Sequence, residues 1–284
     1  MEFWVTQLFN GVSYGALLFL LAGGLSLIFG MMRIVNMTHG SHYLLGAYLA
    51  LTFLTRTGSY VLALLGGALA IAVLGVIEWD RFLQGLRGQE LAQVLTTMGL
   101  ALIFQDLALV TWGGDPYNLK IPAVLSGKYH LGTFFFPVYR VFIIVVALGV
   151  AVVLWLVVER TRVGAMMRAT VDDAEMARGV GINVSGISLG VFALGAALAA
   201  VAGVVAGGFL GIYPGADFEI LSYAFVVVIV GGLGSLRGAL IGSLLVGLLD
   251  NFGKALFPEL SYFTLFAPMA AILAVRPTGL FGRA

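Results

Sequence analysis

Long runs without Asp, Glu, Lys or Arg dominate the chain and alternate with short charged segments. A helix needs about 20 mainly apolar residues to cross the hydrocarbon core of a bilayer. Backbone polar groups inside a bilayer must be hydrogen-bonded within the segment, and the runs lack the period-two alternation of a membrane β-barrel. They therefore predict membrane-spanning helices at residues 8–32, 34–55, 57–77, 91–105, 141–158, 186–216, 220–236, 238–249 and 260–275.

We expect one all-α transmembrane domain over residues 1–284, with about eight or nine crossings, some of them short or broken. Residues 220–236 and 238–249 leave the number open, because together they form either two crossings or one crossing and a re-entrant element. Cationic residues cluster on one side of this topology, which predicts a cytoplasmic C-terminus. No connection is long enough for a soluble domain of about 50 residues.

Composition supports the membrane assignment and narrows the chemistry. Hydrophobic residues make up 61% of the 284 and charged residues 10%, against about 25% charged in an average soluble domain. The chain has no cysteine, which excludes disulfides and thiol chemistry, and its net charge of +1 gives no nucleic-acid footprint.

A polar island interrupts the apolar pattern at residues 33–42. Its hydrogen-bonding groups lie at or inside the membrane, and its glycine permits a helix break, which is tolerated only inside protein or beside a cavity. The island is either a pathway or gate element or a polar interhelical turn. Two histidines make a metal site only with further ligands, and we expect none, because His130 falls on the opposite side. The candidate residues are Asn36, Thr38, His39, Gly40 and His42.

Two further carboxylates border apolar runs. An ionisable group inside a membrane suggests a functional role, so Asp106 is a candidate for proton coupling; the alternative is a bond to a neighbouring helix. Asp250 is expected to be a solvated cap at the end of a span.

Glycines repeat at four-residue spacing in three places. Small residues at this spacing on one helix face let two backbones approach closely, so we expect packing seams, with a subunit interface as the alternative. Residues 231–238 hold too many glycines for a regular helix and predict a turn. The glycines of the two longer seams are Gly203, Gly207, Gly211, Gly234, Gly238 and Gly242.

The charged segment 168–183 lies between two long apolar runs. Its acidic residues precede a cation, which suits the helix dipole, and Gly179 and Gly181 end the helix. A short helix over residues 172–181 is either a docking element for a partner or a solvated loop. The chain has no nucleotide-binding loop and no hydrolase motif, so we expect it not to be an enzyme and not to hydrolyse ATP by itself.

Six motifs, in order, resemble the permease subunits of branched-chain amino-acid ABC importers. They are Val-Asn-Met-Thr-His-Gly, Gly-Leu-Arg-Gly, Thr-Thr-Met-Gly-Leu-Ala-Leu-Ile, Arg-Ala-Thr-Val-Asp-Asp-Ala-Glu-Met-Ala-Arg-Gly-Val-Gly-Ile-Asn, Gly-Gly-Leu-Gly-Ser-Leu-Arg-Gly and Arg-Pro-Thr-Gly-Leu-Phe-Gly. The resemblance covers essentially the whole chain.

The resemblance implies a multi-pass subunit of the bacterial inner membrane. Its partners would be a second, homologous permease, two cytoplasmic ATPases that bind ATP and Mg²⁺, and a periplasmic substrate-binding protein that docks on loops 113–137 and 213–219. This chain would itself hold no cofactor. The segment that couples to an ATPase would include Arg168, Ala169, Asp172, Asp173, Ala174, Ala177, Gly181 and Asn183.

Two departures leave the substrate open. Met37 stands where the family usually has an aromatic residue, and Gln84-Gly-Leu-Arg-Gly88 replaces a common Arg-Pro-Leu-Arg-Gly. Relatives import urea, short amides, or aromatic and other carboxylic acids. A stand-alone secondary transporter that uses Asp106 and the island is the alternative outside the family, and an integral-membrane enzyme has the least support.

Overall fold

The computed structural model describes residues 2–131, 134–260 and 263–282. Helices account for most of this part of the chain. Their bounds are α1 Glu2–Met32, α2 Thr38–Thr57, α3 Tyr60–Glu78, η1 Trp79–Leu83, η2 Gln84–Leu86, α4 Glu90–Trp112, η3 Ala123–Leu125, α5 Val138–Arg160, α6 Arg162–Asp172, α7 Ala174–Gly179, α8 Val184–Gly207, α9 Ala216–Gly231, α10 Leu236–Leu256, η4 Pro258–Leu260 and α11 Phe263–Val275.

Six helical segments are long and apolar enough to cross a bilayer. They are Glu2–Met32, Tyr60–Leu86, Glu90–Trp112, Val138–Arg160, Val184–Gly207 and Leu236–Leu256. The all-α membrane architecture is therefore confirmed. The expectation of eight or nine crossings depends in addition on α2, α9 and α11, which are shorter or more polar, and it stays a prediction.

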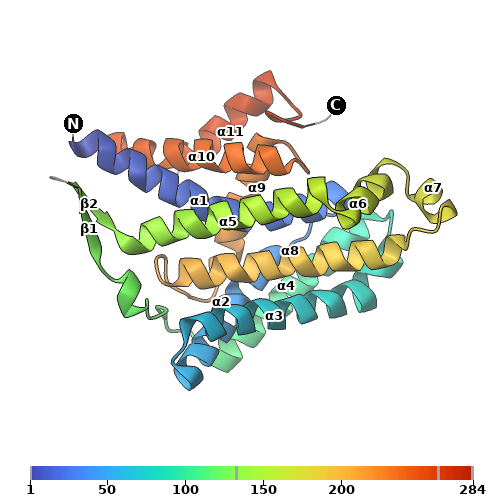
Figure 1. Ribbon diagram of the computed structural model, residues 1–284, viewed down its shortest axis with the longest axis horizontal. Coiled ribbons are helices and arrows are strands. Elements are labelled where there is room, and N and C mark those ends of the chain that lie inside the picture. Colours follow the sequence, from blue (N-terminus) through green and yellow to red (C-terminus); the bar gives the residue numbers. More distant parts are fainter. Residues whose placement is uncertain (1, 132–133, 261–262, 283–284) are drawn as a thin grey trace.

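The helices run side by side, so the molecule has two ends (Figure 1). The N-terminus and a small antiparallel hairpin, β1 (Lys128–Leu131) with β2 (Phe134–Pro137), lie at one end. Helices α6 and α7 lie at the other. We call these the hairpin end and the α7 end. The hairpin falls within the loop that the sequence left without regular structure.

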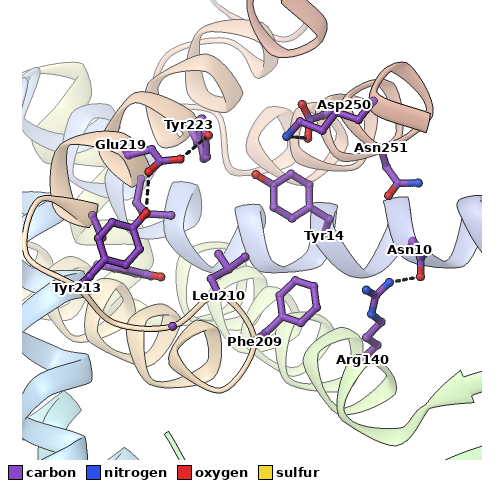
Figure 2. Close-up of a pocket in the computed structure, with 15 residues that line it drawn as sticks. Asn10, Tyr14, Arg140, Phe209, Leu210, Tyr213, Glu219, Tyr223, Asp250 and Asn251 are labelled. Atoms are coloured by element: carbon purple, nitrogen blue, oxygen red, sulfur yellow. Dashed lines mark hydrogen bonds and ion pairs between the residues drawn. The ribbon is translucent and has the colours of Figure 1, made fainter. Parts of the chain in front are cut away.

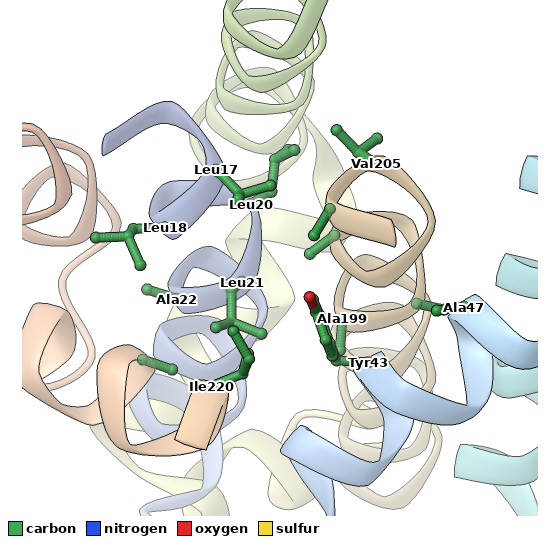
Figure 3. Close-up of a cluster of buried hydrophobic side chains, with 14 of the residues drawn as sticks. Leu17, Leu18, Leu20, Leu21, Ala22, Tyr43, Ala47, Ala199, Val205 and Ile220 are labelled. Atoms are coloured by element: carbon green, nitrogen blue, oxygen red, sulfur yellow. The ribbon is translucent and has the colours of Figure 1, made fainter. Parts of the chain in front are cut away.

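Helices α1 and α8 form the centre of the bundle. In α1, 78% of the most apolar window is buried, and in α8 67%, against 17–33% in the other four candidate spans. Helix α1 packs along α10, α8 and α5, while α8 packs on α1, α2 and α3. The apolar side chains between them form one large buried cluster, part of which is drawn in Figure 3. Exposed apolar side chains on α3, α4 and α5 suit a lipid or protein environment.

Glycines set the spacing of α2 against its neighbours. A Cβ on Gly203 of α8 would lie 2.0 Å from the backbone carbonyl oxygen of Tyr43, and one on Gly46 of α2 would lie 2.5 Å from Cα of Ala200. A Cβ on Gly40 would lie 2.2 Å from the carbonyl oxygen of Asp217, at the start of α9. Helix α2 is thus held against α8 and α9 at contact distances that no larger residue allows.

The glycine seams differ from the sequence expectation at two positions. Helix α8 ends at Gly207, so Gly211 lies beyond the helix with φ +81°. Gly234 has φ +78° and lies against Gly30 in the turn between α9 and α10, the turn that residues 231–238 predicted. A Cβ on Gly238 would lie 2.2 Å from the carbonyl oxygen of Gly231, and one on Gly242 would also meet α9.

We predict that Gly203→Ala lowers the stability of the chain in mild detergent by about 1–3 kcal/mol, because the added methyl group forces α8 away from the α2 backbone. Gly190→Ala, on the same helix, is the matched control, since a Cβ there has no neighbour within 4 Å. Thermal unfolding of the two purified variants gives the comparison. Equal melting temperatures would show that the α2–α8 spacing is not constrained at Gly203.

Candidate functional site

A cavity of about 320 Å³ opens among α1, α5, α9, α10 and the segment that follows α8 (Figure 2). Its walls combine the aromatic and aliphatic side chains of Phe209, Leu210 and Ile220 with four tyrosines and four charged residues. The tyrosines are Tyr14, Tyr43, Tyr213 and Tyr223, and the charged residues are Arg140, Glu219, Asp250 and Lys254. We call this cavity the pocket. A mainly apolar lining with a few polar groups is typical of small-molecule sites.

One pair of charges in the pocket neutralises itself. Lys254 Nζ lies 2.7 Å from Asp250 Oδ2, and the hydroxyl group of Thr264 donates to Asp250 Oδ1 over 2.9 Å. The Asp250 side chain is 3% exposed. The sequence expectation of a solvated cap is therefore wrong for Asp250, because α11 and the next turn of α10 cover it.

The other two charges in the pocket have only neutral partners among the residues that the structure describes. The hydroxyl groups of Tyr213 and Tyr223 donate to the two carboxylate oxygens of Glu219, each over 2.8 Å. Arg140 donates to the side-chain oxygen of Asn10, and its guanidinium carbon lies 4.9 Å from the centre of the Phe209 ring. The hydrogen bond to Glu219, together with burial, raises the pKa of Tyr213, so this hydroxyl stays a donor.

The pocket ends in an apolar layer. Leu17, Leu18 and Leu21 of α1 lie beyond Tyr14, and with Tyr43 and Ile220 they enclose a void of about 10 Å³, no more than one water molecule. Figure 3 shows Leu21 beside Ile220, with Tyr43 facing them from α2. At 1.5 Å per residue, Leu21 lies about 10 Å further along α1 than Tyr14. This layer separates the pocket from the polar groups beyond it.

Those polar groups surround the start of α2, deep in the bundle. The carbonyl oxygen of Leu21 accepts from Nε2 of His39 over 2.9 Å. His42 Nε2 lies 2.7 Å from Glu78 Oε1, and Thr38 Oγ1 lies 2.9 Å from Glu78 Oε2 and 2.6 Å from Asn36 Oδ1. All of these side chains are at most 1% exposed. We call Asn36, Thr38, His42 and Glu78 the buried polar cluster.

Helix α9 begins beside this cluster. The hydroxyl group of Ser41 lies 3.3 Å from Asp217 Oδ2, in the first turn of α9. Helices α2 and α9 therefore both begin inside the bundle, where their first turns cross. Broken helices at membrane depth are found where they are buried in protein or line a cavity, and both conditions hold here.

The structure brings together most of the island that the sequence singled out, with one change of role. Thr38 and His42 meet at Glu78 and Asn36 contacts Thr38, while Gly40 lies inside the first turn of α2 and does not break the helix. The break is residues 33–37, where Arg33 has φ +53°. Asp106 is exposed on α4 and contacts neither the pocket nor the cluster.

Sequence reasoning missed Glu78, Asp217 and the pocket. Glu78 directly follows the charge-free run 57–77, so the sequence predicts that the span ends before it. In the structure the apolar residues Trp79 and Leu83 continue the span to Leu86. The pocket draws its side chains from segments far apart in the chain, and no local pattern joins them.

Comparison with known proteins decides the family. Residues 7–273 match the family model described as branched-chain amino acid transport system / permease component. The chain belongs to this family. The expected resemblance is thereby confirmed.

Relatives match along nearly the whole chain. The high-affinity branched-chain amino acid transport system permease protein BraD of Pseudomonas aeruginosa is 31% identical, covering 99% of this chain and 96% of its own length. LivH of Escherichia coli K12, from a transport system of the same description, is 28% identical, covering 99% and 96%. The ribose import permease protein RbsC of the same strain is 27% identical, covering 95% and 84%.

A solved structure shares the fold. The chain superposes on PsaBC from Streptococcus pneumoniae in complex with Fab with a TM-score of 0.51, at 13% identity, covering 94% of this chain and 89% of that one. At this identity the likeness speaks for the fold alone.

At the α7 end, the charged segment of this permease forms two helices. The short helix expected over residues 172–181 is present as α7 but is shorter, because Asp173 has an extended backbone (φ −154°) and separates α6 from α7. The Asp173 side chain accepts from the backbone N–H groups of Glu175 and Met176, and so begins α7. Gly181, with φ +89°, ends the turn after α7. The side chain of Asn183 accepts from Gly186 N and begins α8.

The exposed face of α7 differs from the one that the small residues suggested. Ala177 is buried within the chain and Ala174 is half-buried, whereas Met176 and Val180 are 65% and 71% exposed. The remaining predicted residues lie on α6, where Arg168 donates to the carbonyl oxygen of Val158, Ala169 accepts from Asp173 N, and Asp172 is exposed.

The loop before α4 lies near α7. The Arg87 guanidinium lies 5.1 Å from the centre of the Trp79 ring, and burial together with nearby Arg178 of α7 lowers the pKa of Arg87. The Gln84 side chain donates to the Ser185 hydroxyl over 2.8 Å. The Gln84 contact joins this segment to the start of α8, which in turn packs on α7.

We predict that Glu78→Ala destabilises the permease by about 3–5 kcal/mol, because it leaves His42 Nε2 buried without its partner and removes one of the two contacts of the Thr38 hydroxyl group. Glu78→Gln keeps an acceptor and costs less. Glu159→Gln is the control: Glu159 pairs with Arg237 at the surface over 3.7 Å, and such pairs contribute at most about 1 kcal/mol. Unfolding in detergent compares the three variants. An effect of Glu78→Ala no larger than that of the control would refute the stabilising role of the cluster.

Proposed function

We propose that this chain is the membrane subunit of an ATP-binding-cassette importer and forms half of the pathway for branched-chain or other hydrophobic amino acids. The observation that carries the proposal is the match of residues 7–273 to the permease family. BraD and LivH are named as permeases for branched-chain amino acids, and RbsC for ribose, so the family assignment alone leaves the substrate open.

The pocket favours a small molecule with both charged and apolar parts. Phe209, Leu210 and Ile220 offer apolar contacts, while Glu219 and Arg140 offer one charge of each sign. An amino-acid zwitterion with an aliphatic side chain has the same combination. Urea and short amides carry no charge, and the simple carboxylic acids carry only one, so the lining supports these alternatives less well.

In this proposal the hairpin end faces the outside of the cell and the α7 end faces the cytoplasm of a bacterium. Cations favour the cytoplasmic side of a membrane protein, and most of the described ones, including the arginines of α6 and α7, lie at the α7 end. A periplasmic binding protein would deliver substrate at the hairpin end, where the pocket lies.

The chain itself carries no catalysis in this account. Two ATPase subunits would bind ATP and Mg²⁺ and would seat against α7 and the neighbouring loop, while a second, homologous permease completes the pathway. The two permeases would have two arrangements. ATP binding would favour one of them, because the ATPases would make different contacts with the permeases in each arrangement. Met176 on α7 and Val180, directly after it, offer an exposed apolar surface for this contact.

The proposal predicts that the complete complex, reconstituted in proteoliposomes, accumulates radiolabelled leucine only with both ATP and the binding protein. Omitting either component should reduce uptake to the level of empty liposomes. Transport by this chain alone, driven by a proton gradient, would refute the proposal and favour a secondary transporter.

We predict further that the double variant Met176→Asp, Val180→Asp reduces the amount of ATPase that copurifies with the permease at least fivefold, because two charges replace an apolar contact. Val124→Asp is the matched control, since Val124 is 87% exposed but lies at the hairpin end. Undiminished copurification of the double variant would show that α7 is not the ATPase contact.

A further inference from the structure

The pocket carries an arrangement that goes beyond general transport. Asp250 and Lys254 form an ion pair with each other. Of the four charged residues that line the pocket, Glu219 and Arg140 form no ion pair with a described residue. A charge that faces the cavity without an ion-pair partner stays available to a ligand group of opposite sign. Each of the two is therefore a candidate contact for a ligand group of opposite sign.

Glu219 is held ready for such a contact. Tyr213, from the loop before α9, and Tyr223, one turn further along α9, each donate to one carboxylate oxygen, so the group is fixed from two sides. Both donors are neutral and stabilise the negative charge without cancelling it. The N-terminal end of the α9 dipole acts in the same sense, because Glu219 lies in the first turn.

The carboxylate keeps room for a ligand. A carboxylate offers about four acceptor positions, and the tyrosines use two of them. Glu219 is exposed, and its carboxylate lines the pocket (Figure 2). A primary ammonium group is a compact cation with three donors and suits the two open positions. The fixed geometry also lowers the entropy lost when the contact forms.

Arg140 gives the pocket a direction. It lies in the first turn of α5, beside Asn10, and Asn10 precedes Tyr14 by about one helical turn towards the hairpin end of α1. Figure 2 shows Arg140 and Glu219 at opposite sides of the pocket. Their field aligns a zwitterion with its ammonium group towards α9 and its carboxylate towards the hairpin end, even when one molecule does not touch both residues.

We propose that Glu219, positioned by Tyr213 and Tyr223, binds the α-ammonium group of an amino-acid substrate in the pocket. This inference rests on the proposed function. The aliphatic side chain then packs on Leu210 and Ile220, next to the apolar layer. Substrates without an ammonium group, such as ribose or a simple carboxylic acid, would leave Glu219 unpaired and would be disfavoured at this step.

The test measures leucine uptake and ATPase activity together, in the complete complex with saturating binding protein. Glu219→Gln should reduce uptake at least tenfold and leave the stimulation of ATPase activity by the binding protein within twofold of wild type. Glu219→Asp keeps the charge and should retain more uptake than Glu219→Gln. Glu2→Gln, which removes an exposed carboxylate outside the pocket at the same end, should change neither activity.

The tyrosines give a second route to the same result. Tyr213→Phe and Tyr223→Phe should each reduce uptake severalfold, because each frees the carboxylate from one of its two donors. These variants decide the question if Glu219→Gln does not assemble, and unchanged uptake in both would then overturn the proposal.

The outcomes separate the two proposals. Uptake by Glu219→Gln within twofold of wild type would overturn the ammonium site. Parallel loss of uptake and of ATPase stimulation would overturn it too, since Glu219 would then belong to the docking surface for the binding protein. Absence of ATP-dependent uptake in wild type would instead refute the proposed function itself.

Discussion

Close contact between helix backbones is the constraint on which the rest of this structure depends. Helix α2 lies against α8 and α9 at Gly46, Gly203 and Gly40, where even one extra methyl group meets backbone atoms. Because lipid gives helices little hydrophobic reason to associate, such contacts contribute much of the packing energy inside a membrane. They fix where α2 begins, and with it the positions of His39 and His42.

The place where α2 begins sets the positions of both the apolar layer and the buried polar cluster. Tyr43, on α2, closes the pocket together with Leu21 and Ile220, and His42, the residue before it, reaches Glu78. The apolar layer and the buried polar cluster are thus adjacent parts of one arrangement. A rearrangement of α2 against α9 would therefore alter both the apolar layer and the buried polar cluster.

Much of the architecture could be predicted from the sequence, because charge-free runs of bilayer length have few structural solutions. The six candidate spans, the turn at residues 231–238 and the family all follow from local patterns. Details that depend on tertiary contact could not be predicted. The sequence predicts a solvated cap at Asp250, but α11 covers this side chain in the structure. The sequence likewise predicts that a span ends before Glu78, but Trp79 and Leu83 beyond it are buried.

The candidate site shows the same limit. The polar island was visible because its residues are neighbours in the chain, whereas Glu219, Arg140 and Asn10 come from three distant segments. The short helix at residues 172–181 was expected because acidic residues precede a cation, but the extended backbone of Asp173 makes it begin only at Ala174. Small residues suggested a docking face at Ala177, and tertiary packing instead leaves Met176 and Val180 exposed.

In the orientation that we propose, the pocket opens to the outside of the cell and ends at an apolar layer inside the bundle. The chain has no cysteine, so single cysteines can be placed without background: Leu210→Cys in the pocket and Leu21→Cys in the layer. A membrane-impermeant thiol reagent added to right-side-out membrane vesicles without ATP should label Leu210→Cys and leave Leu21→Cys unlabelled. Equal labelling of the two positions, or no labelling of Leu210→Cys, would contradict the account.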